Sequence, residues 1–223
     1  MSAATLVFDL DGTLVDTAPD LIDTLNVMLA RHQVATVDYA KARALIGGGV
    51  KPLIERALAC RRLSAAEIDA IFQQYLEHYV AHIADRSRPY PGVTDALDLL
   101  ARRGYRLAVC TNKLEGLAVR LLEALGLKDR FAAICGPDTF GVRKPDPAIL
   151  RGTLTRAGGR AERALMVGDS GTDVVTARAA GVPVVLVGFG YTEIPVSELG
   201  ADRIITHFDA LPAAVDELIA LPT

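Results

Sequence analysis

The part of the chain after Gly92 alternates short apolar segments with amphipathic ones, and this alternation limits the possible folds more than any other feature. It predicts strands at residues 106–110, 132–135, 164–167 and 184–187. Between them and before the first, it predicts helices at 93–103, 148–157 and 173–180, and one that follows Asn112 and ends at Leu125. The strand segments are apolar throughout, as in parallel strands buried on both faces. With Thr5–Phe8 as a further strand, the pattern predicts an α/β protein with a doubly wound, Rossmann-like parallel sheet.

The segment between the first strand and Gly92 has a different periodicity. From Leu21 to about His82 the apolar residues recur at helical spacing, and no strand-like segment interrupts them. The prolines and the glycine of residues 88–92 mark a turn where the pattern changes. We therefore expect an all-helical domain at residues 16–86, inserted into an α/β core made of residues 1–15 and 87–223.

Composition narrows the range of partners. Hydrophobic residues make up 51% of the 223 residues, and the formal net charge of -3 gives no basic surface for nucleic acid. No apolar run approaches the roughly 20 residues that span a bilayer. Residues 1–4 lead into the first predicted strand without a basic segment and an apolar stretch, so no signal region is expected. The three cysteines lie in apolar stretches, so we expect them to be small buried side chains. A cytoplasmic protein without nucleic-acid or membrane partners is expected, as a monomer or a homodimer.

Polar residues gather where the predicted strands end. Asp9 and Asp11 follow the first strand, Thr111-Asn112-Lys113 follows the second, and Gly168–Asp173 follows a later one. Lys144 lies just before a predicted helix start. Because ligands bind beyond the carboxyl ends of strands in such sheets, we expect these residues to share one site.

The residue types in these clusters complement one another. Asp9, Asp169 and Asp173 supply the oxygen ligands that Mg²⁺ prefers. Hydroxyl, amide and ammonium donors, the set that suits phosphate oxygens, come from Thr111, Asn112 and Lys144. A metal, an anion pocket and two neighbouring carboxylates indicate phosphoryl transfer to a carboxylate nucleophile. Lys144 in a structural ion pair, and Asp9 and Asp11 in a solvated acidic turn, are the alternatives.

Four segments in this order resemble the motifs of the haloacid dehalogenase superfamily, over nearly the whole chain. The segments are Asp9-Leu10-Asp11-Gly12-Thr13, Thr111-Asn112, Lys144-Pro145 and Gly168-Asp169-Ser170-Gly171-Thr172-Asp173. The helical insertion resembles the mobile cap of that superfamily. Further segments resemble its phosphoglycolate phosphatase branch: Leu45–Val50, Tyr90–Val93, Ala179–Val182 and Gly188–Tyr191.

The resemblance implies a role for each motif residue. Asp9 would be the nucleophile that forms an aspartyl-phosphate, and Asp11 the general acid and base. The metal would be Mg²⁺, with Asp9, the backbone carbonyl of Asp11 and Asp169 as ligands and Asp173 in support. Gly12 would let the backbone approach the phosphate, whose oxygens would be held by Thr111, Asn112 and Lys144.

The expected cap contains fewer signals. Its glycines Gly47, Gly48 and Gly49 are interpreted as a loop that faces the substrate, because glycine amides can approach an anion closely. Arg43 is a candidate partner for a substrate carboxylate. His78 and His82 are expected on an exposed helix face rather than in a metal site, and Tyr191 is expected to pack or to lie at the surface.

The implied function is Mg²⁺-dependent hydrolysis of a small phosphomonoester, with 2-phosphoglycolate as the preferred candidate. A phosphosugar mutase would keep both aspartates of the first motif, and so would a phosphatase acting broadly on sugar phosphates and nucleotides. A non-catalytic binding protein on the same scaffold is the last alternative. Because Asp9, Asp11 and Lys144 are all present, it is the least favoured.

Overall fold

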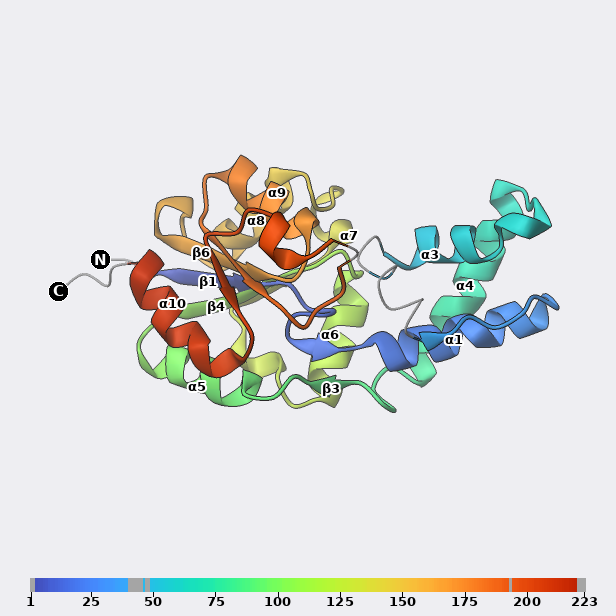
Figure 1. Ribbon diagram of the computed structural model, residues 1–223, viewed down its shortest axis with the longest axis horizontal. Coiled ribbons are helices and arrows are strands. Elements are labelled where there is room, and N and C mark those ends of the chain that lie inside the picture. Colours follow the sequence, from blue (N-terminus) through green and yellow to red (C-terminus); the bar gives the residue numbers. More distant parts are fainter. Residues whose placement is uncertain (1–2, 40–45, 47–48, 193, 220–223) are drawn as a thin grey trace.

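In a computed structural model of the chain, a six-stranded sheet forms the centre of the molecule (Figure 1). The structure describes residues 3–39, 46, 49–192 and 194–219. All neighbouring strands in this sheet are parallel, in the order β5-β4-β1-β6-β7-β8. Their bounds are β1 Thr5–Phe8, β4 Arg106–Cys110, β5 Ala133–Cys135, β6 Ala164–Gly168, β7 Val184–Val187 and β8 Arg203–Ile205. The doubly wound parallel sheet expected from the sequence is confirmed.

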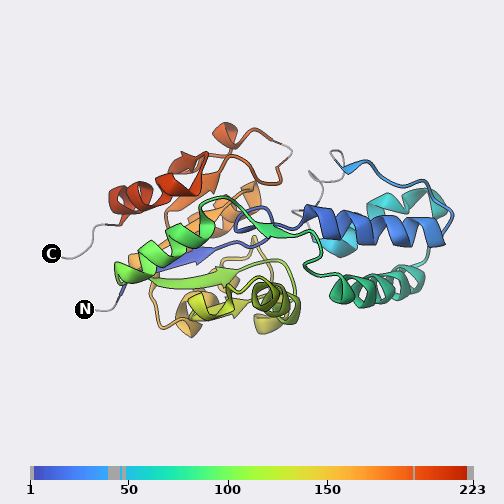
Figure 2. The same cartoon turned by 90° about the horizontal axis from the view of Figure 1, so that it is seen from below.

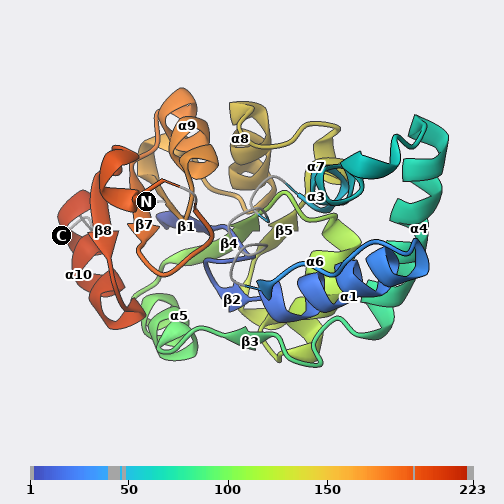
Figure 3. The same cartoon turned by 45° about the vertical axis from the view of Figure 1, so that its right-hand side comes forward.

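Helices cover both faces of the sheet, because strand side chains point alternately to opposite sides. Leu6 and Phe8 of β1 face one apolar cluster, whereas Val7 faces the other. Figure 3 shows α8 and α9 on one side of the sheet and α5 and α6 on the other. The bounds of these and the C-terminal helix are α5 Val93–Arg102, α6 Glu115–Ala124, α8 Pro147–Arg156, α9 Gly171–Ala180 and α10 Leu211–Leu218.

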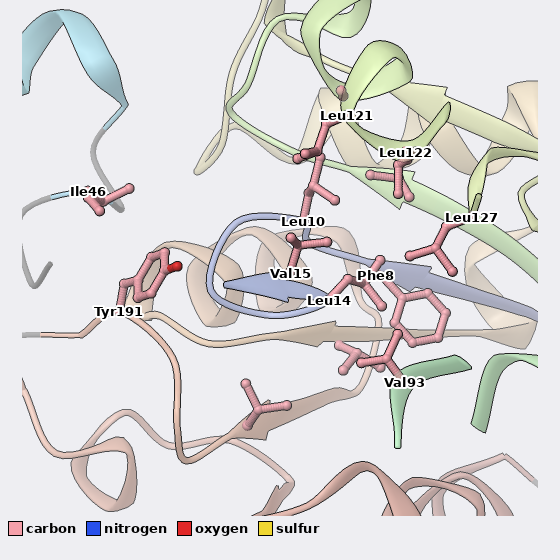
Figure 4. Packing of buried hydrophobic residues seen from close by; sticks show 14 of the residues in the cluster. Phe8, Leu10, Leu14, Val15, Ile46, Val93, Leu121, Leu122, Leu127 and Tyr191 are labelled. Atoms are coloured by element: carbon pink, nitrogen blue, oxygen red, sulfur yellow. The ribbon is translucent and has the colours of Figure 1, made fainter. Parts of the chain in front are cut away.

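The apolar core continues under the loop that follows β1. Figure 4 shows Phe8, Leu10, Leu14 and Val15 packed together near Val93, and each of these five side chains is fully buried. The loop that carries Asp9 and Asp11 is therefore anchored by buried apolar side chains before, between and after its two aspartates.

The remaining long helices lie at one end of the molecule, away from both termini (Figures 1 and 2). They are α1 Ala18–Arg31, α3 Val50–Ala57 and α4 Ala65–Ala81. Helix α4 packs on α1, and the Tyr75 hydroxyl donates a hydrogen bond of 2.9 Å to the Leu21 carbonyl. These helices fall within residues 16–86, although the exact division into core and cap stays a prediction. None of the described helices combines the length and apolar character needed to cross a membrane.

Some elements were not expected. Strand β8 lies at the sheet edge with two of its three residues exposed, so it lacks the apolar signature of a central strand. Also unexpected are α10, the short helix α7 (Pro137–Phe140) and the two-residue strands β2 (Val15–Asp16) and β3 (Arg88–Pro89). The expectation for cysteines was wrong for Cys60, which is exposed, whereas Cys110 and Cys135 are buried.

The two chain segments that connect the sheet to helices α1, α3 and α4 lie side by side. β2 and β3 pair antiparallel, and Asp20 in the first turn of α1 binds the returning chain. Its Oδ2 accepts hydrogen bonds from the Ser87 amide (2.8 Å) and hydroxyl (2.6 Å), and its Oδ1 accepts one from the Arg86 amide (3.0 Å). Asp20 is 3% exposed, so these donors have little access to water.

Replacing Asp20 by alanine is expected to lower the free energy of unfolding by roughly 1–3 kcal/mol, because buried donors lose their acceptor. Asp23→Ala is the matched control, since Asp23 lies on the same helix but pairs with Arg86 at an exposed position. That variant is expected to cost about 0–1 kcal/mol. Urea unfolding of the two variants measures both effects. Equal losses would contradict a structural role for the buried carboxylate.

Candidate active site

The site is built on the central strand of the sheet. β1 lies between β4 and β6, so Asp9 and Asp11 emerge between the ends of the strands that lead to Thr111 and to Asp169. Asp9 accepts a hydrogen bond from the Leu10 amide at 2.7 Å. The chain then turns sharply at Gly12, where φ is +83°. A side chain at Gly12 would also place its Cβ 2.4 Å from an Asp169 oxygen.

Lys144 connects Asp9, which follows β1, to Asp173 in the first turn of α9. Its Nζ lies 2.9 Å from Asp9 Oδ1 and 2.6 Å from Asp173 Oδ1, and the residue is 2% exposed. Asn112 holds the backbone of Lys144: its side-chain oxygen accepts from the Lys144 amide at 2.9 Å, and its amide group donates to the Lys144 carbonyl at 3.2 Å. The Asn112 side chain is thus engaged in positioning Lys144.

Three carboxylates converge beside Lys144. Oxygens of Asp9, Asp169 and Asp173 lie within 4.8 Å of one another, and all three residues are buried. Asp173 already has several partners, because its Oδ2 accepts hydrogen bonds from the Ser170 hydroxyl (2.9 Å) and amide (3.1 Å). Asp169 Oδ1 accepts from the Thr13 hydroxyl at 3.3 Å. Asp9 and Asp169 are therefore better placed to bind a cation directly than Asp173.

The electrostatics of this cluster are unfavourable without a further positive charge. Burial raises the pKa of Asp9 to about 7, against the opposing effect of Lys144. Burial, with Asp173 and Asp9 nearby, also raises the pKa of Asp169 well above its ordinary value. Burial alone would lower the pKa of Lys144, but Asp173 and Asp9 raise it. One ammonium cannot neutralise three buried carboxylates, so the donor set fits a divalent cation.

Lys113 is a site residue to which the sequence analysis gave no role. Its side chain is 5% exposed, and its Nζ lies 2.9 Å from Asp11 Oδ1. The only sequence signal was its place directly after Thr111-Asn112 at a strand end. Its partner could not be read from the sequence, because Asp11 lies on another strand's loop.

Tyr191 is buried, at 2% exposure, and contacts both the site and the connection to the helices. Its backbone amide donates to Asp169 Oδ2 at 2.5 Å. Its hydroxyl donates to Asp16 Oδ1 at 2.6 Å and accepts from the Ala18 amide at 2.8 Å. The expected packing role is therefore joined by a backbone contact to the acidic cluster.

A cavity of about 230 Å³ lies between the carboxyl ends of the strands and helices α1, α3 and α4. Asp9, Asp11, Thr111 and Lys144 line one side, and apolar side chains from α1, α3 and α4 line the other. Of the expected cap residues, Gly49 lines this cavity. Arg43, Gly47 and Gly48 lie outside the residues that the structure describes.

His78 lies on α4 and is half-buried, whereas His82 is the exposed residue that directly follows this helix. The expected exposed helix face is therefore wrong for His78. His82 Nδ1 is 2.7 Å from Asp85 Oδ2, and His78 Nδ1 is 3.3 Å from the Thr24 hydroxyl. Within the described ranges, the cluster of Asp9, Asp169 and Asp173 is the only group of three such side chains close enough to share a metal, and neither histidine belongs to it.

The raised pKa of Asp9 predicts how stability depends on pH when metal is chelated. In the folded protein this pKa, about 7, lies above its ordinary value of 3.8. Protonation of Asp9 therefore stabilises the folded state below pH 7, and this stabilisation is lost as the pH rises through 7. On going from pH 8 to pH 6, we expect the free energy of unfolding to increase by about 1 kcal/mol more in the wild-type protein than in Asp9→Asn. Urea unfolding with chelator tests this, and identical pH dependence in both proteins would contradict it.

Comparisons with known proteins agree with the fold and identify the family. The haloacid dehalogenase-like hydrolase family matches residues 6–187. A phosphoglycolate phosphatase of Mesorhizobium japonicum is 52% identical over 219 residues, which are 97% of this chain and 96% of the relative. A phosphoglycolate phosphatase of Agrobacterium fabrum is 48% identical, over 96% of this chain and 93% of the relative.

Solved structures show the same architecture. The crystal structure of a predicted phosphoglycolate phosphatase from Haemophilus somnus superposes with a TM-score of 0.89 at 31% identity, covering 96% of this chain and 99% of that one. The structure of CbbY from Rhodobacter sphaeroides in complex with phosphate gives a TM-score of 0.78 at 28% identity, covering 94% and 96%. The chain therefore belongs to the haloacid dehalogenase-like hydrolase family and is a phosphatase.

Proposed function

We propose that this phosphatase hydrolyses 2-phosphoglycolate, using Mg²⁺ and an aspartyl-phosphate on Asp9. The observation that carries the mechanism is the position of the Lys144 ammonium between Asp9 and Asp173, within a buried acidic cluster. The substrate is supported by the phosphoglycolate phosphatases of two other organisms at 52% and 48% identity. A cavity of about 230 Å³ also suits a small metabolite, since sites for larger ligands are usually roughly 300–1,000 Å³.

In the first half of the reaction, an Asp9 oxygen attacks phosphorus and the bond to the ester oxygen breaks. Asp11, two residues along the same turn, donates a proton to the departing ester oxygen, which leaves as an alcohol. Lys144 and the Thr111 hydroxyl bind the phosphoryl oxygens, and the hydrogen bonds from Asn112 hold Lys144 in place. Gly12 leaves room for the phosphoryl group beside the turn.

In the second half, a water molecule attacks the phosphorus of the aspartyl-phosphate. Asp11, now ionised, takes a proton from that water, and the bond between phosphorus and the Asp9 oxygen breaks. Inorganic phosphate leaves, and Asp9 is again a carboxylate. The same carboxyl group thus serves as acid and then as base, which suits its place beside the nucleophile.

The metal would be held by Asp9, by the backbone carbonyl of Asp11 and by Asp169, with Asp173 in support. Bound there, Mg²⁺ would offset the charge that develops on the phosphoryl oxygens. The chain's own part is to keep the carboxylates together: Thr13 and the Tyr191 amide hold Asp169, and Ser170 and Lys144 hold Asp173. The helices of residues 16–86 would act as a cap that closes the site from water.

Substrate and mechanism are tested together by measuring phosphate release from 2-phosphoglycolate, hexose phosphates and nucleoside monophosphates. We expect the highest kcat/KM for 2-phosphoglycolate and loss of release when Mg²⁺ is chelated. Asp9→Asn is expected to lower kcat at least about a thousandfold, because no nucleophile remains. Asp23→Asn, at an exposed position, is the control for the substitution itself. A sugar-centred profile would overturn the substrate, and turnover by Asp9→Asn would overturn the mechanism.

The close contact between Gly190 and Asp169 gives a test of the metal site. A Cβ at Gly190 would lie 2.2 Å from Asp169 Cβ and 2.5 Å from Oδ2, so the carboxylate must move. Gly190→Ala is expected to weaken Mg²⁺ binding roughly 10- to 100-fold, as loss of ligand support does elsewhere. Calorimetric titration with Mg²⁺ measures it. Gly116→Ala is the matched control, because a Cβ at Gly116 meets nothing within 4 Å, and unchanged binding in both variants would contradict the assignment.

A further inference from the structure

The Lys113 ammonium lies between the candidate site and helix α4. It is 2.9 Å from Asp11 Oδ1 and 4.7 Å from the centre of the Tyr79 ring on α4. Its side chain is 5% exposed, and the residue lines the cavity together with Asp11 and Tyr79. In the proposed reaction Asp11 faces the leaving oxygen, so Lys113 lies beside the part of the substrate that leaves.

The ammonium keeps binding capacity beyond these contacts. It has three N–H donors, of which the Asp11 carboxylate takes one. The Tyr79 ring covers a second side through its π face, which attracts a cation without accepting a strong hydrogen bond. A donor therefore remains for an anion in the cavity.

The other basic side chains of the cavity are less suited to this task. Among the described residues the cavity has four: Lys51, Lys113, Arg143 and Lys144. Lys144 is held between Asp9 and Asp173. Lys51 pairs with Asp69 and its side chain is 44% exposed, and Arg143 is an exposed residue. Lys113 is thus the deeply buried cation that lies next to the leaving-group side of the site.

The wall of the cavity opposite the acidic cluster is apolar, so an anionic ligand that contacts this wall needs a cation beside it. The cavity is lined by apolar and aromatic side chains from α1 and α4: Leu21, Phe72, Tyr75, Leu76 and Tyr79. A carboxylate among such groups loses hydration and binds only if it is paired. In this setting an ionic hydrogen bond is stronger than at a solvated surface.

We propose that Lys113 binds the carboxylate of the substrate and selects phosphomonoesters that carry a second negative charge next to the ester carbon. In 2-phosphoglycolate that carboxylate is attached to the carbon that bears the ester oxygen, so it lies on the Asp11 side of the phosphorus. One ammonium then contacts both the general acid and the leaving group. This assignment rests on the proposed function and adds the residue that determines its specificity.

The test compares 2-phosphoglycolate with 2-hydroxyethyl phosphate, which replaces the carboxylate by a neutral hydroxymethyl group. In Lys113→Gln the amide can still donate to Asp11, but the charge is gone. We expect the ratio of the two kcat/KM values to fall roughly 10- to 100-fold, because one ionic hydrogen bond is lost for one substrate only. Lys51→Met removes a charge from the same cavity and is expected to keep the wild-type ratio.

Binding provides a second readout that does not need turnover. In the Asp9→Asn background, calorimetry is expected to show weaker binding of 2-phosphoglycolate when Lys113 is also replaced by Gln, and little change for 2-hydroxyethyl phosphate. An equal loss for both esters would overturn the proposal and leave Lys113 as a positioning residue for Asp11. A wild-type enzyme that hydrolyses neither ester would instead overturn the proposed substrate. Circular dichroism melting curves confirm that each variant is folded, and Lys113→Met provides a second neutral side chain.

Discussion

The buried contact of Lys144 with Asp9 and Asp173 is the interaction on which the rest of the site depends. It holds together the loop after β1, the first turn of α9 and the segment before α8, which are far apart in the sequence. Three buried carboxylates around one ammonium retain excess negative charge. Burial raises the pKa of Asp9 to about 7, and the neighbouring Asp173 adds to this rise. The donor set fits a divalent cation, whose charge would offset this imbalance.

The same acidic cluster contacts the chain segment that leads from the sheet into helix α1. Tyr191 contacts Asp169 with its amide and Asp16 with its hydroxyl, and Asp20 binds the returning chain at Ser87. Tyr191 thus links the acidic cluster to the segment that leads into α1, and Asp20 ties that helix to the returning chain. Lys113, between Asp11 and the Tyr79 ring, adds a contact across the cavity itself.

Particular elements show how far the sequence could be interpreted. The strands at the centre of the sheet are apolar runs, so β1, β4, β6 and β7 were found within two residues of their bounds. β8 was missed because an edge strand with two exposed residues has no such pattern. Asp9, Thr111 and Asp169 were recognised from motifs at strand ends and Lys144 from its place before a helix, and the four residues do lie together. The role of Lys113 was missed, since no local pattern indicates which carboxylate a lysine will meet.

By itself, the sequence determined the α/β class, the family and the residues of the four polar motifs, because periodicity and short-range spacing are local properties of a chain. Only the tertiary structure decided how those residues pair. The Asn112 side chain holds the Lys144 backbone, Asp173 is already satisfied by Ser170 and Lys144, and Lys113 meets Asp11 and Tyr79. These are contacts between segments distant in the chain, and they depend on the order of the strands and the packing of helices over the sheet edge, which local patterns do not contain.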